Sequence, residues 1–212
     1  MRAALIDYGS GNIASAAKAL ARAASQTSGH EIAVTADPDV VRASERIILP
    51  GVGAFADCMK GLSAVPGMVD ALNESVLRDG KPILGICVGM QLMASAGREF
   101  GTHKGLNWIG GDVVPVMPAD PLLKIPHMGW NEIALVQNHP LFADLGAKAN
   151  AYFVHSFEMK PADSAHLLAI TDYGGTVTAA IGRDNIVGTQ FHPEKSQDVG
   201  LAILGNFLSW KP

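Results

Sequence analysis

The sequence predicts an α/β protein with a largely parallel central sheet and helices on both faces of that sheet. Short continuous apolar runs alternate with segments of helical composition, and glycine or proline follows several of the runs. The 212 residues are 48% hydrophobic but only 17% charged. An ordinary soluble domain is roughly 25% charged, so this composition favours one large buried core. We therefore expect residues 1–212 to form a single domain.

Strands and helices are expected to alternate in the first half of the chain. The apolar run at residues 3–6 ends at a glycine-containing turn, and the alanine-rich segment 13–24 has the composition of a helix. Further strands are expected at 31–35, 46–49 and 81–86, and further helices at 55–62 and 68–77. Pro50-Gly51-Val52-Gly53 ends the third strand, because proline and glycine break the pattern there.

The second half of the chain has a different composition. Residues 101–126 are rich in glycine and proline, and runs containing valine, isoleucine and threonine follow them. These runs lie at 132–136, 151–157, 167–171, 176–181 and 186–191. They predict an antiparallel extension of the same sheet. A final helix is expected at 197–208.

Charge and cysteine content exclude several classes of protein. The formal net charge is -4 and no basic run occurs, which argues against a nucleic-acid partner. Cys58 and Cys87 lack the spacing of a disulfide framework or a metal site, so we expect a reducing compartment and no metal. The first apolar run stops at Asp7, too early for a signal peptide, and no stretch approaches a membrane span. We expect a cytoplasmic protein that binds no membrane.

One cysteine lies between a predicted strand and a predicted helix. Gly85-Ile86-Cys87-Val88-Gly89 follows the buried strand and precedes the helical segment 90–94. This is the cysteine form of the G-x-S-x-G elbow, in which small neighbours permit a strained turn that presents the nucleophile. We expect Cys87 to be a nucleophile and the Val88 N–H to be an oxyanion donor. A buried core cysteine is the alternative, and Cys58, which lacks such neighbours, is expected to be structural.

A base for this nucleophile is expected downstream, in Phe191-His192-Pro193-Glu194. In an extended segment, side chains two residues apart point to the same side, so His192 and Glu194 can act together. Pro193 favours an extended His192. The imidazole can take the Cys87 proton and return it to the leaving group while the carboxylate orients the ring. Alone, this motif is more typical of a turn, and its weight comes from the upstream cysteine.

The elbow, continued through Met90-Gln91, and the His-Pro-Glu motif together resemble class I, triad-type glutamine amidotransferases across essentially the whole chain. The resemblance implies that family's α/β fold and an enzyme without cofactor or metal, which hydrolyses L-glutamine to glutamate and ammonia. It implies an oxyanion hole formed by Val88 with Gly51 and Val52. Because glycines flank Val52, this loop is expected to act as a switch. The residues that it places around the substrate glutamine are Gln91, His155, Ser156 and Phe157.

Five further strings resemble one subfamily of these enzymes, which supplies ammonia for histidine biosynthesis. They are Asp7-Tyr8-Gly9-Ser10-Gly11-Asn12, Leu49-Pro50-Gly51-Val52-Gly53-Ala54-Phe55, Pro126-His127-Met128-Gly129-Trp130-Asn131, Tyr152-Phe153-Val154-His155-Ser156 and His192-Pro193-Glu194-Lys195-Ser196. The resemblance implies a heterodimer with a (β/α)8-barrel cyclase subunit, HisF. It places Asn12, Trp130 and Lys195 at that interface.

Three alternatives remain at this point. Residues 9–14 satisfy G-x-G-x-x-A after a strand, which would indicate a dinucleotide-binding oxidoreductase, but Asp37 comes late for the acid that such a site needs. A second alternative is another Cys-His α/β protein, such as an intracellular peptidase or a DJ-type stress protein, against which the His-Pro-Glu motif argues. A third is an amidotransferase serving another acceptor, against which the string at 126–131 argues.

Overall fold

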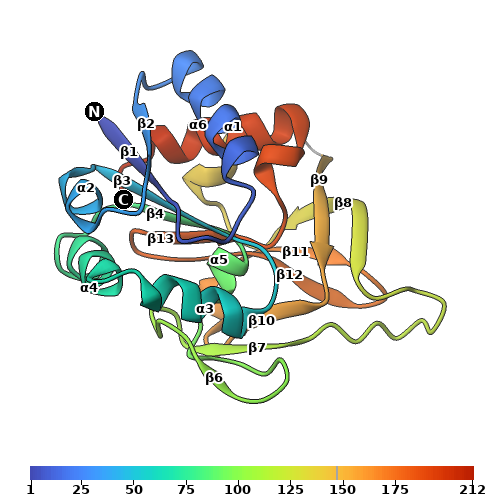
Figure 1. Ribbon diagram of the computed structural model, residues 1–212. Helices are drawn as coiled ribbons and strands as arrows, with labels where there is room; N and C mark the ends of the chain where they lie inside the picture. The colour runs from blue at the N-terminus through green and yellow to red at the C-terminus, as the bar shows by residue number, and fades with distance from the viewer. Residues whose placement is uncertain (147) are drawn as a thin grey trace.

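The computed structural model describes residues 1–146 and 148–212, which form one large and one small β-sheet (Figure 1). Within these residues the large sheet has nine strands, in the order β2-β1-β3-β4-β13-β12-β11-β8-β9. They are β1 (Arg2–Ile6), β2 (Glu31–Thr35), β3 (Arg46–Gly51), β4 (Ile83–Cys87), β8 (His127–Leu135), β9 (Ala149–His155), β11 (Leu167–Asp172), β12 (Thr176–Arg183) and β13 (Ile186–Thr189). The small sheet, in the order β10-β7-β5-β6, contains β5 (Ala96–Gly97), β6 (His103–Lys104), β7 (Gly111–Pro115) and β10 (Phe157–Pro161).

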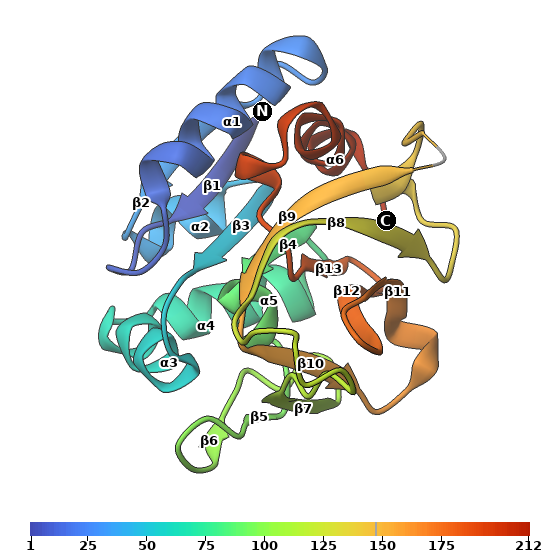
Figure 2. The same cartoon turned by 90° about the vertical axis from the view of Figure 1, so that its right-hand side faces the viewer.

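Helices cover both faces of the parallel half of the large sheet, as the sequence predicts (Figures 1 and 2). On one face α1 (Ile13–Gln26) packs against α6 (Gln197–Ser209). The opposite face carries α3 (Phe55–Ala64), α4 (Met68–Asn73) and the π-helical turn η1 (Glu74–Arg78). Short 3-10 turns lie at η2 (Pro140–Phe142), η3 (Ser164–His166) and η4 (Pro193–Lys195).

The short helix α2 (Pro38–Ala43), which packs against α4, has no counterpart among the elements expected from the sequence. Its N-terminus has a local cause: the Asp37 carboxylate accepts a hydrogen bond from the Asp39 N–H at 2.8 Å. Pro38 occupies the first helical position, where a missing N–H costs nothing. The six residues of α2 are too few to show a helical period.

The strand predictions for the second half need two corrections. The run at 151–157 is not one strand, because β9 ends at His155 and β10 begins at Phe157. Ser156 between them takes the chain from the large sheet, where β9 pairs with β8, to the small sheet, where β10 pairs with β7. The antiparallel part of the large sheet is also one strand smaller than expected. The run that contains β13 was expected to belong to it, but β13 is parallel to β4 and antiparallel only to β12.

The topology brings several chain segments together at the carboxyl ends of the parallel strands. The chain leaves β1 toward β2 on one side and leaves β3 toward β4 on the other. Such a divergence opens a crevice at the sheet edge, where α/β proteins commonly bind ligands. Gly89 permits a close approach here, because a Cβ at this position would collide with the Leu49 carbonyl oxygen. The turn after β4 therefore packs directly on the end of β3.

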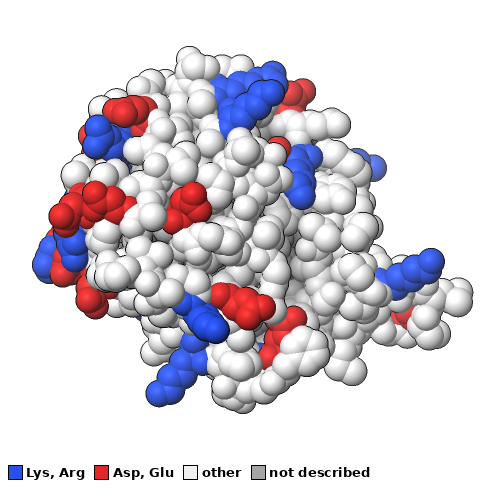
Figure 3. Space-filling model, in the orientation of Figure 1, with Lys and Arg blue, Asp and Glu red and all other residues white. Residues whose placement is uncertain are grey.

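Charged side chains are sparse on the surface, as the composition implies. On the face shown in Figure 3, positive and negative side chains are interspersed, and uncharged surface covers much of the centre. Several large apolar side chains are exposed, among them Met128 and Trp130 on β8. No helix within the part of the chain that the structure describes is long and apolar enough to cross a membrane.

Candidate active site

Cys87 has the strained conformation that the elbow motif predicts. It is the last residue of β4, with φ 54° and ψ -113°, a backbone conformation that residues other than glycine rarely adopt. The residue is 3% exposed. The following helix α5 is shorter than expected and lies earlier, at Val88–Gln91 instead of 90–94. A single helical turn places the Val88 N–H directly after Cys87 but contributes few aligned peptide dipoles.

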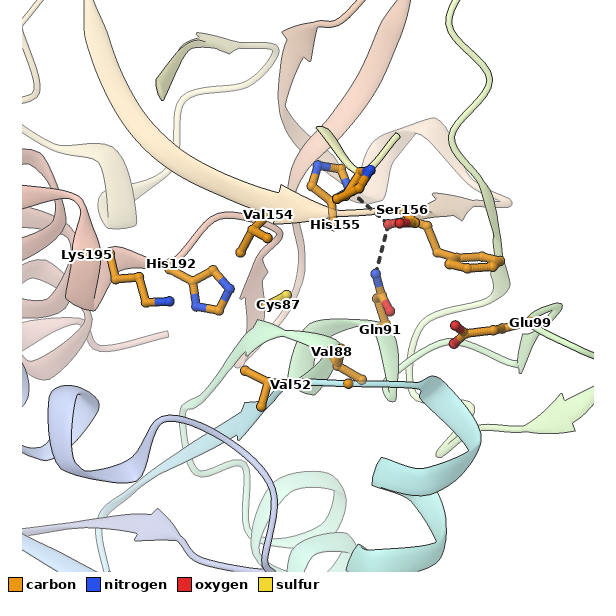
Figure 4. Close-up of a pocket in the computed structure, with 13 residues that line it drawn as sticks. Val52, Cys87, Val88, Gln91, Glu99, Val154, His155, Ser156, His192 and Lys195 are labelled. Atoms are coloured by element: carbon orange, nitrogen blue, oxygen red, sulfur yellow. Dashed lines mark hydrogen bonds between the residues drawn. The ribbon is translucent and has the colours of Figure 1, made fainter. Parts of the chain in front are cut away.

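His192 lies beside Cys87 (Figure 4) and forms a buried pair with Glu194. His192 Nδ1 lies 2.8 Å from Glu194 Oε1, and both side chains are at most 3% exposed. The local backbone differs from the expected strand. His192 is extended, but Pro193 starts the 3-10 turn η4, so the carboxylate reaches the ring through a tight turn. Proline fits that position because the first residue of such a turn needs no N–H donor.

The surroundings of His192 raise its pKa from 6.5 to about 9. Burial by itself lowers the pKa, but interactions with the Cys87 thiol and the Glu194 carboxylate outweigh it. The backbone around the ring is also held, because the His192 N–H donates to the Tyr152 carbonyl at 2.9 Å. At neutral pH the imidazolium form is therefore favoured, flanked by a sulfur on one side and a carboxylate on the other.

A cavity of about 320 Å³ opens onto Cys87 and His192 (Figure 4). Most of the residues predicted for the site line it: Val52, Cys87, Val88, Gln91, His155, Ser156, Phe157, His192 and Lys195. Gly51 lies at the end of β3 and Glu194 behind His192. Asn12 and Trp130 lie outside the cavity. Trp130 contacts the ring of Tyr152, over which Lys195 Nζ lies at 5.7 Å, so these side chains form a surface beside the cavity.

Sequence reasoning missed two polar residues of the site. Glu99 points into the cavity, and its carboxylate accepts a hydrogen bond from the Phe55 N–H at 2.9 Å. Gln190 Nε2 donates to Cys87 Sγ at 3.6 Å, and its Oε1 accepts from Gln91 Nε2 at 3.0 Å. Gln190 lies two residues before His192, directly after the strand, and this position was the one sequence signal that could have indicated a role in the site. No local pattern marked Glu99.

The loop expected to complete an oxyanion hole is hydrogen-bonded to the turn that follows β1. The Val52 N–H donates to Ser10 Oγ at 3.3 Å, and this hydroxyl donates to the Val52 carbonyl at 2.8 Å. Cys58 Sγ also donates to the Val52 carbonyl at 3.3 Å and lies 3.1 Å from Ser10 Oγ. The Val52 N–H is thus engaged by a serine and not directed at Cys87. Cys58, expected to be structural, is buried in this contact.

Residues 1–146 and 148–212 contain no group of three or more histidine, cysteine or acidic residues that could hold a metal ion.

The packing of the turn at residues 9–14 does not support the dinucleotide-binding alternative. A Cβ at Gly11 would lie 3.1 Å from the Pro50 side chain, so this turn packs against the end of β3.

Solved structures with this fold include a glutaminase domain. The chain matches a structure of PurLQS from Thermotoga maritima with a TM-score of 0.73 and 19% identity, covering 98% of this chain and 97% of that one. The glutaminase domain of CTPS from Trypanosoma brucei, solved with bound acivicin, matches with a TM-score of 0.65 and 13% identity, over 100% and 95% of the two chains. At these identities the likeness shows the fold alone.

Sequence relatives are much closer. A protein of Brucella suis biovar 1 is 56% identical over the full length of both chains and is named imidazole glycerol phosphate synthase subunit HisH. The proteins of that name from Rhodospirillum rubrum and Zymomonas mobilis are 56% and 55% identical, the latter over 99% of this chain and 96% of its own. The family model for class I glutamine amidotransferases matches residues 4–209. The chain therefore belongs to the class I glutamine amidotransferases and, within them, to the HisH subunits of imidazole glycerol phosphate synthase.

Proposed function

We propose that this chain hydrolyses L-glutamine to glutamate and ammonia with Cys87, His192 and Glu194 as its triad. One observation carries the proposal: the sulfur of Cys87 and the imidazole of His192 line a cavity large enough for an amino acid, and the Glu194 carboxylate contacts the imidazole from behind. The HisH names of the relatives support glutamine as the substrate and histidine biosynthesis as the pathway. Because both halves of the chain supply strands to one sheet, we also propose that residues 1–212 fold as a single domain.

The triad can carry the reaction in two balanced steps. The Cys87 thiolate attacks the side-chain amide carbon of glutamine, the C–N bond breaks, and His192 gives its proton to the leaving nitrogen, which departs as ammonia. A water molecule then attacks the glutamyl thioester, with His192 accepting its proton, and the C–S bond breaks to release glutamate. Glu194 holds the ring so that its other nitrogen faces the sulfur, and it stabilises the imidazolium.

The cavity offers suitable groups for the amino-acid end of glutamine. Gln91 uses its Nε2 for the carbonyl of Phe157 and for Gln190, which leaves its Oε1 as an acceptor. Together with the Glu99 carboxylate, that oxygen can receive the α-ammonium group. Backbone groups of the segment His155 to Phe157 line the same wall, which suits the α-carboxylate. Binding of this kind fixes the distance from the α-carbon to Cys87.

The oxyanion hole would combine the Val88 N–H with a donor from the loop after β3. The Gly51–Val52 peptide has to turn for this, because its N–H is held by Ser10. Gly53, with φ 99°, adopts a conformation that favours glycine and can absorb such a rotation. We therefore expect the loop to rest in a state of low activity and to turn when the partner and its ligand bind.

Ser10→Ala should raise the glutaminase activity of the chain without a partner by about 3- to 10-fold, since losing hydrogen bonds worth about 0.5–1.5 kcal/mol weakens the resting state. Ammonia release from glutamine measures the effect in steady state. Ser28→Ala, which removes a hydroxyl that has no hydrogen-bond partner among the described residues, is the matched control. Unchanged basal activity in Ser10→Ala would show that Ser10 does not restrain the loop.

We propose that the ammonia passes to the (β/α)8-barrel cyclase HisF in a heterodimer. The acceptor reaction would yield imidazole glycerol phosphate and an aminoimidazole carboxamide ribotide (AICAR). The surface beside the cavity supports docking there, because Asn12, Trp130 and Lys195 are exposed around the site, and exposed Met128 adds apolar area. The biosynthetic role of the relatives supports action in the cytoplasm.

A glutamine-like diazoketone, applied to the complex of the chain with its cyclase, tests the function directly. Mass spectrometry should place one adduct on Cys87, because the strained elbow presents that sulfur to the cavity whereas Cys58 is enclosed behind Val52. Excess L-glutamine should protect Cys87. An adduct on Cys58 alone, or labelling that glutamine does not slow, would contradict the proposed site.

A further inference from the structure

Two buried histidines face each other outside the triad. His127 on β8 and His155 on β9 are paired residues of the antiparallel ladder, so their side chains share a face of the sheet. His127 Nδ1 lies 3.0 Å from His155 Nε2, and the two residues are 2% and 6% exposed. The His127 ring stacks between Phe153 and Tyr173, with ring centroids 4.8 and 4.0 Å away. The catalytic steps above do not use this pair.

The hydrogen bonds around the pair determine which nitrogens carry protons. Burial lowers the pKa of each ring to about 4, so at neutral pH each has one donor and one acceptor nitrogen. His155 Nδ1 lies 2.9 Å from the carbonyl oxygen of Phe157, which can only accept. The proton of His155 is therefore on Nδ1, its Nε2 is an acceptor, and His127 Nδ1 must donate to it.

Asn131 independently requires the same arrangement at the other end. Its Oδ1 accepts from the Glu132 N–H at 2.8 Å, and its Nδ2 donates to the Asp172 carbonyl at 2.8 Å, which fixes the orientation of the amide. The same Nδ2 lies 3.3 Å from His127 Nε2, which is consequently an acceptor. Both ends of the chain of hydrogen bonds thus require the Nδ1–H form of the two histidines.

This chain of hydrogen bonds continues to the nucleophile. The Phe157 carbonyl that accepts from His155 also accepts from Gln91 Nε2 at 2.9 Å. Gln91 Nε2 also donates to Gln190 Oε1, and Gln190 Nε2 faces Cys87 Sγ. With both of its N–H groups committed, Gln91 can present only its oxygen to the cavity. A rotation of the Phe157 carbonyl would release that constraint.

We propose that His127 and His155 are positioning residues for glutamine, which act as an ordered pair of Nδ1–H donors that hold the Phe157 carbonyl and, through it, the acceptor oxygen of Gln91. The pair also joins Asn131, in the β8 segment that carries exposed Trp130, to the substrate cavity. The inference rests on the proposed glutaminase activity. It makes the binding of the substrate's ammonium group by Gln91 depend on two histidine side chains that do not touch that group.

Kinetics of His127→Phe in the complex with the cyclase provide the first test. Phenylalanine keeps the stacking on Phe153 and Tyr173 but removes the donor. The KM for glutamine should rise about 10-fold with kcat within about 2-fold, because a contact common to ground and transition states is weakened. His127→Asn, whose amide can donate from near the Nδ1 position, should recover part of the loss. His30→Phe, at a buried histidine before β2, is the matched control and should leave the KM unchanged.

Nitrogen NMR of the full chain labelled with ¹⁵N-histidine provides the second test, which does not depend on activity. Both rings should show a protonated Nδ1 and an unprotonated Nε2 at pH 7. An Nε2–H form for either ring would overturn the inference even if glutaminase activity is confirmed. An unchanged KM in a folded His127→Phe variant would overturn it as well. If the tautomers are as expected but no variant hydrolyses glutamine, the proposed function fails instead.

Discussion

Cys87→Ala should lower glutamine-dependent synthesis by the complex at least about 10⁵-fold, because loss of a covalent nucleophile removes nearly all triad catalysis. Synthesis from added ammonium salt should continue at the unmodified rate, since the substitution leaves the cyclase and the docking surface unchanged. The measurement compares product formation with glutamine and with ammonium chloride at matched concentrations of ammonia. Alanine also relieves little of the backbone strain, so the positive φ at this position is retained.

Cys58→Ala is the matched control for this prediction. Cys58 is also free and buried, but it contacts Val52 and Ser10 instead of the cavity. This variant should keep glutamine-dependent synthesis within about 10-fold of the parent, with any change reflecting the loop alone. If Cys87→Ala lost both the glutamine and the ammonia reactions, Cys87 would be a structural residue and the assignment of the nucleophile would fail.

Glu194→Gln should lower kcat for glutamine hydrolysis about 10³- to 10⁴-fold while preserving the size of the side chain. The Glu194 carboxylate accepts the Nδ1 proton of His192, so Nε2 is the nitrogen that faces the sulfur and exchanges a proton during the reaction. A glutamine amide can donate to Nδ1 instead and so favours the opposite tautomer, in which the ring cannot act as the base. Glu158→Gln, at another buried carboxylate, should change stability without changing kcat. Equal losses of kcat in both variants would indicate a general folding defect.

The same variant changes the pH dependence of stability. In the parent, the His192 pKa is raised from 6.5 to about 9, so its stabilising contribution is complete below pH 6.5 and disappears as pH rises through 9. Without the carboxylate the raised pKa falls, and the decline in stability should shift to lower pH. Denaturant unfolding between pH 6 and 10 and a proton NMR titration of His192 measure the two effects. An unshifted titration in Glu194→Gln would show that the carboxylate does not stabilise the imidazolium.

The parallel half of the fold could be predicted because most of its strands are buried on both faces and therefore contain continuous apolar runs, such as residues 47–49. The elbow was readable for a similar reason, since Gly85 and Gly89 mark a turn that permits little else. The transfer between sheets at Ser156 was not readable, because the flanking residues all favour strand and only the pairing partners differ. The two-residue strands β5 and β6 carry no periodic signal at all.

The three residues proposed as the triad could be singled out in the sequence because the histidine and the carboxylate are neighbours and the cysteine has a distinctive turn. The contacts that support the triad could not be, because they join distant segments. Ser10 meets Val52 across 42 positions, and Gln91 meets Gln190 across 99. The periodicity of apolar residues shows which face of a segment is buried but not which distant segment packs against that face. Such partners are visible only in the folded structure. Gln190 and Glu99 belong to this class.

The close contact between β3 and the turn after β4 limits how the oxyanion loop can move. A Cβ at Gly51 would lie 2.6 Å from the Gly89 nitrogen, so the strand end is clamped at this point, whereas a Cβ at Gly53 would meet none of the described residues within 4 Å. The motion available is consequently a rotation of the Gly51–Val52 peptide plane, with Gly51 held in place and Gly53 free to change its dihedral angles. It exchanges a few hydrogen bonds without repacking the core, so a modest amount of docking energy suffices to drive it. The activation proposed above would then require no slow rearrangement of the core and would be reversible.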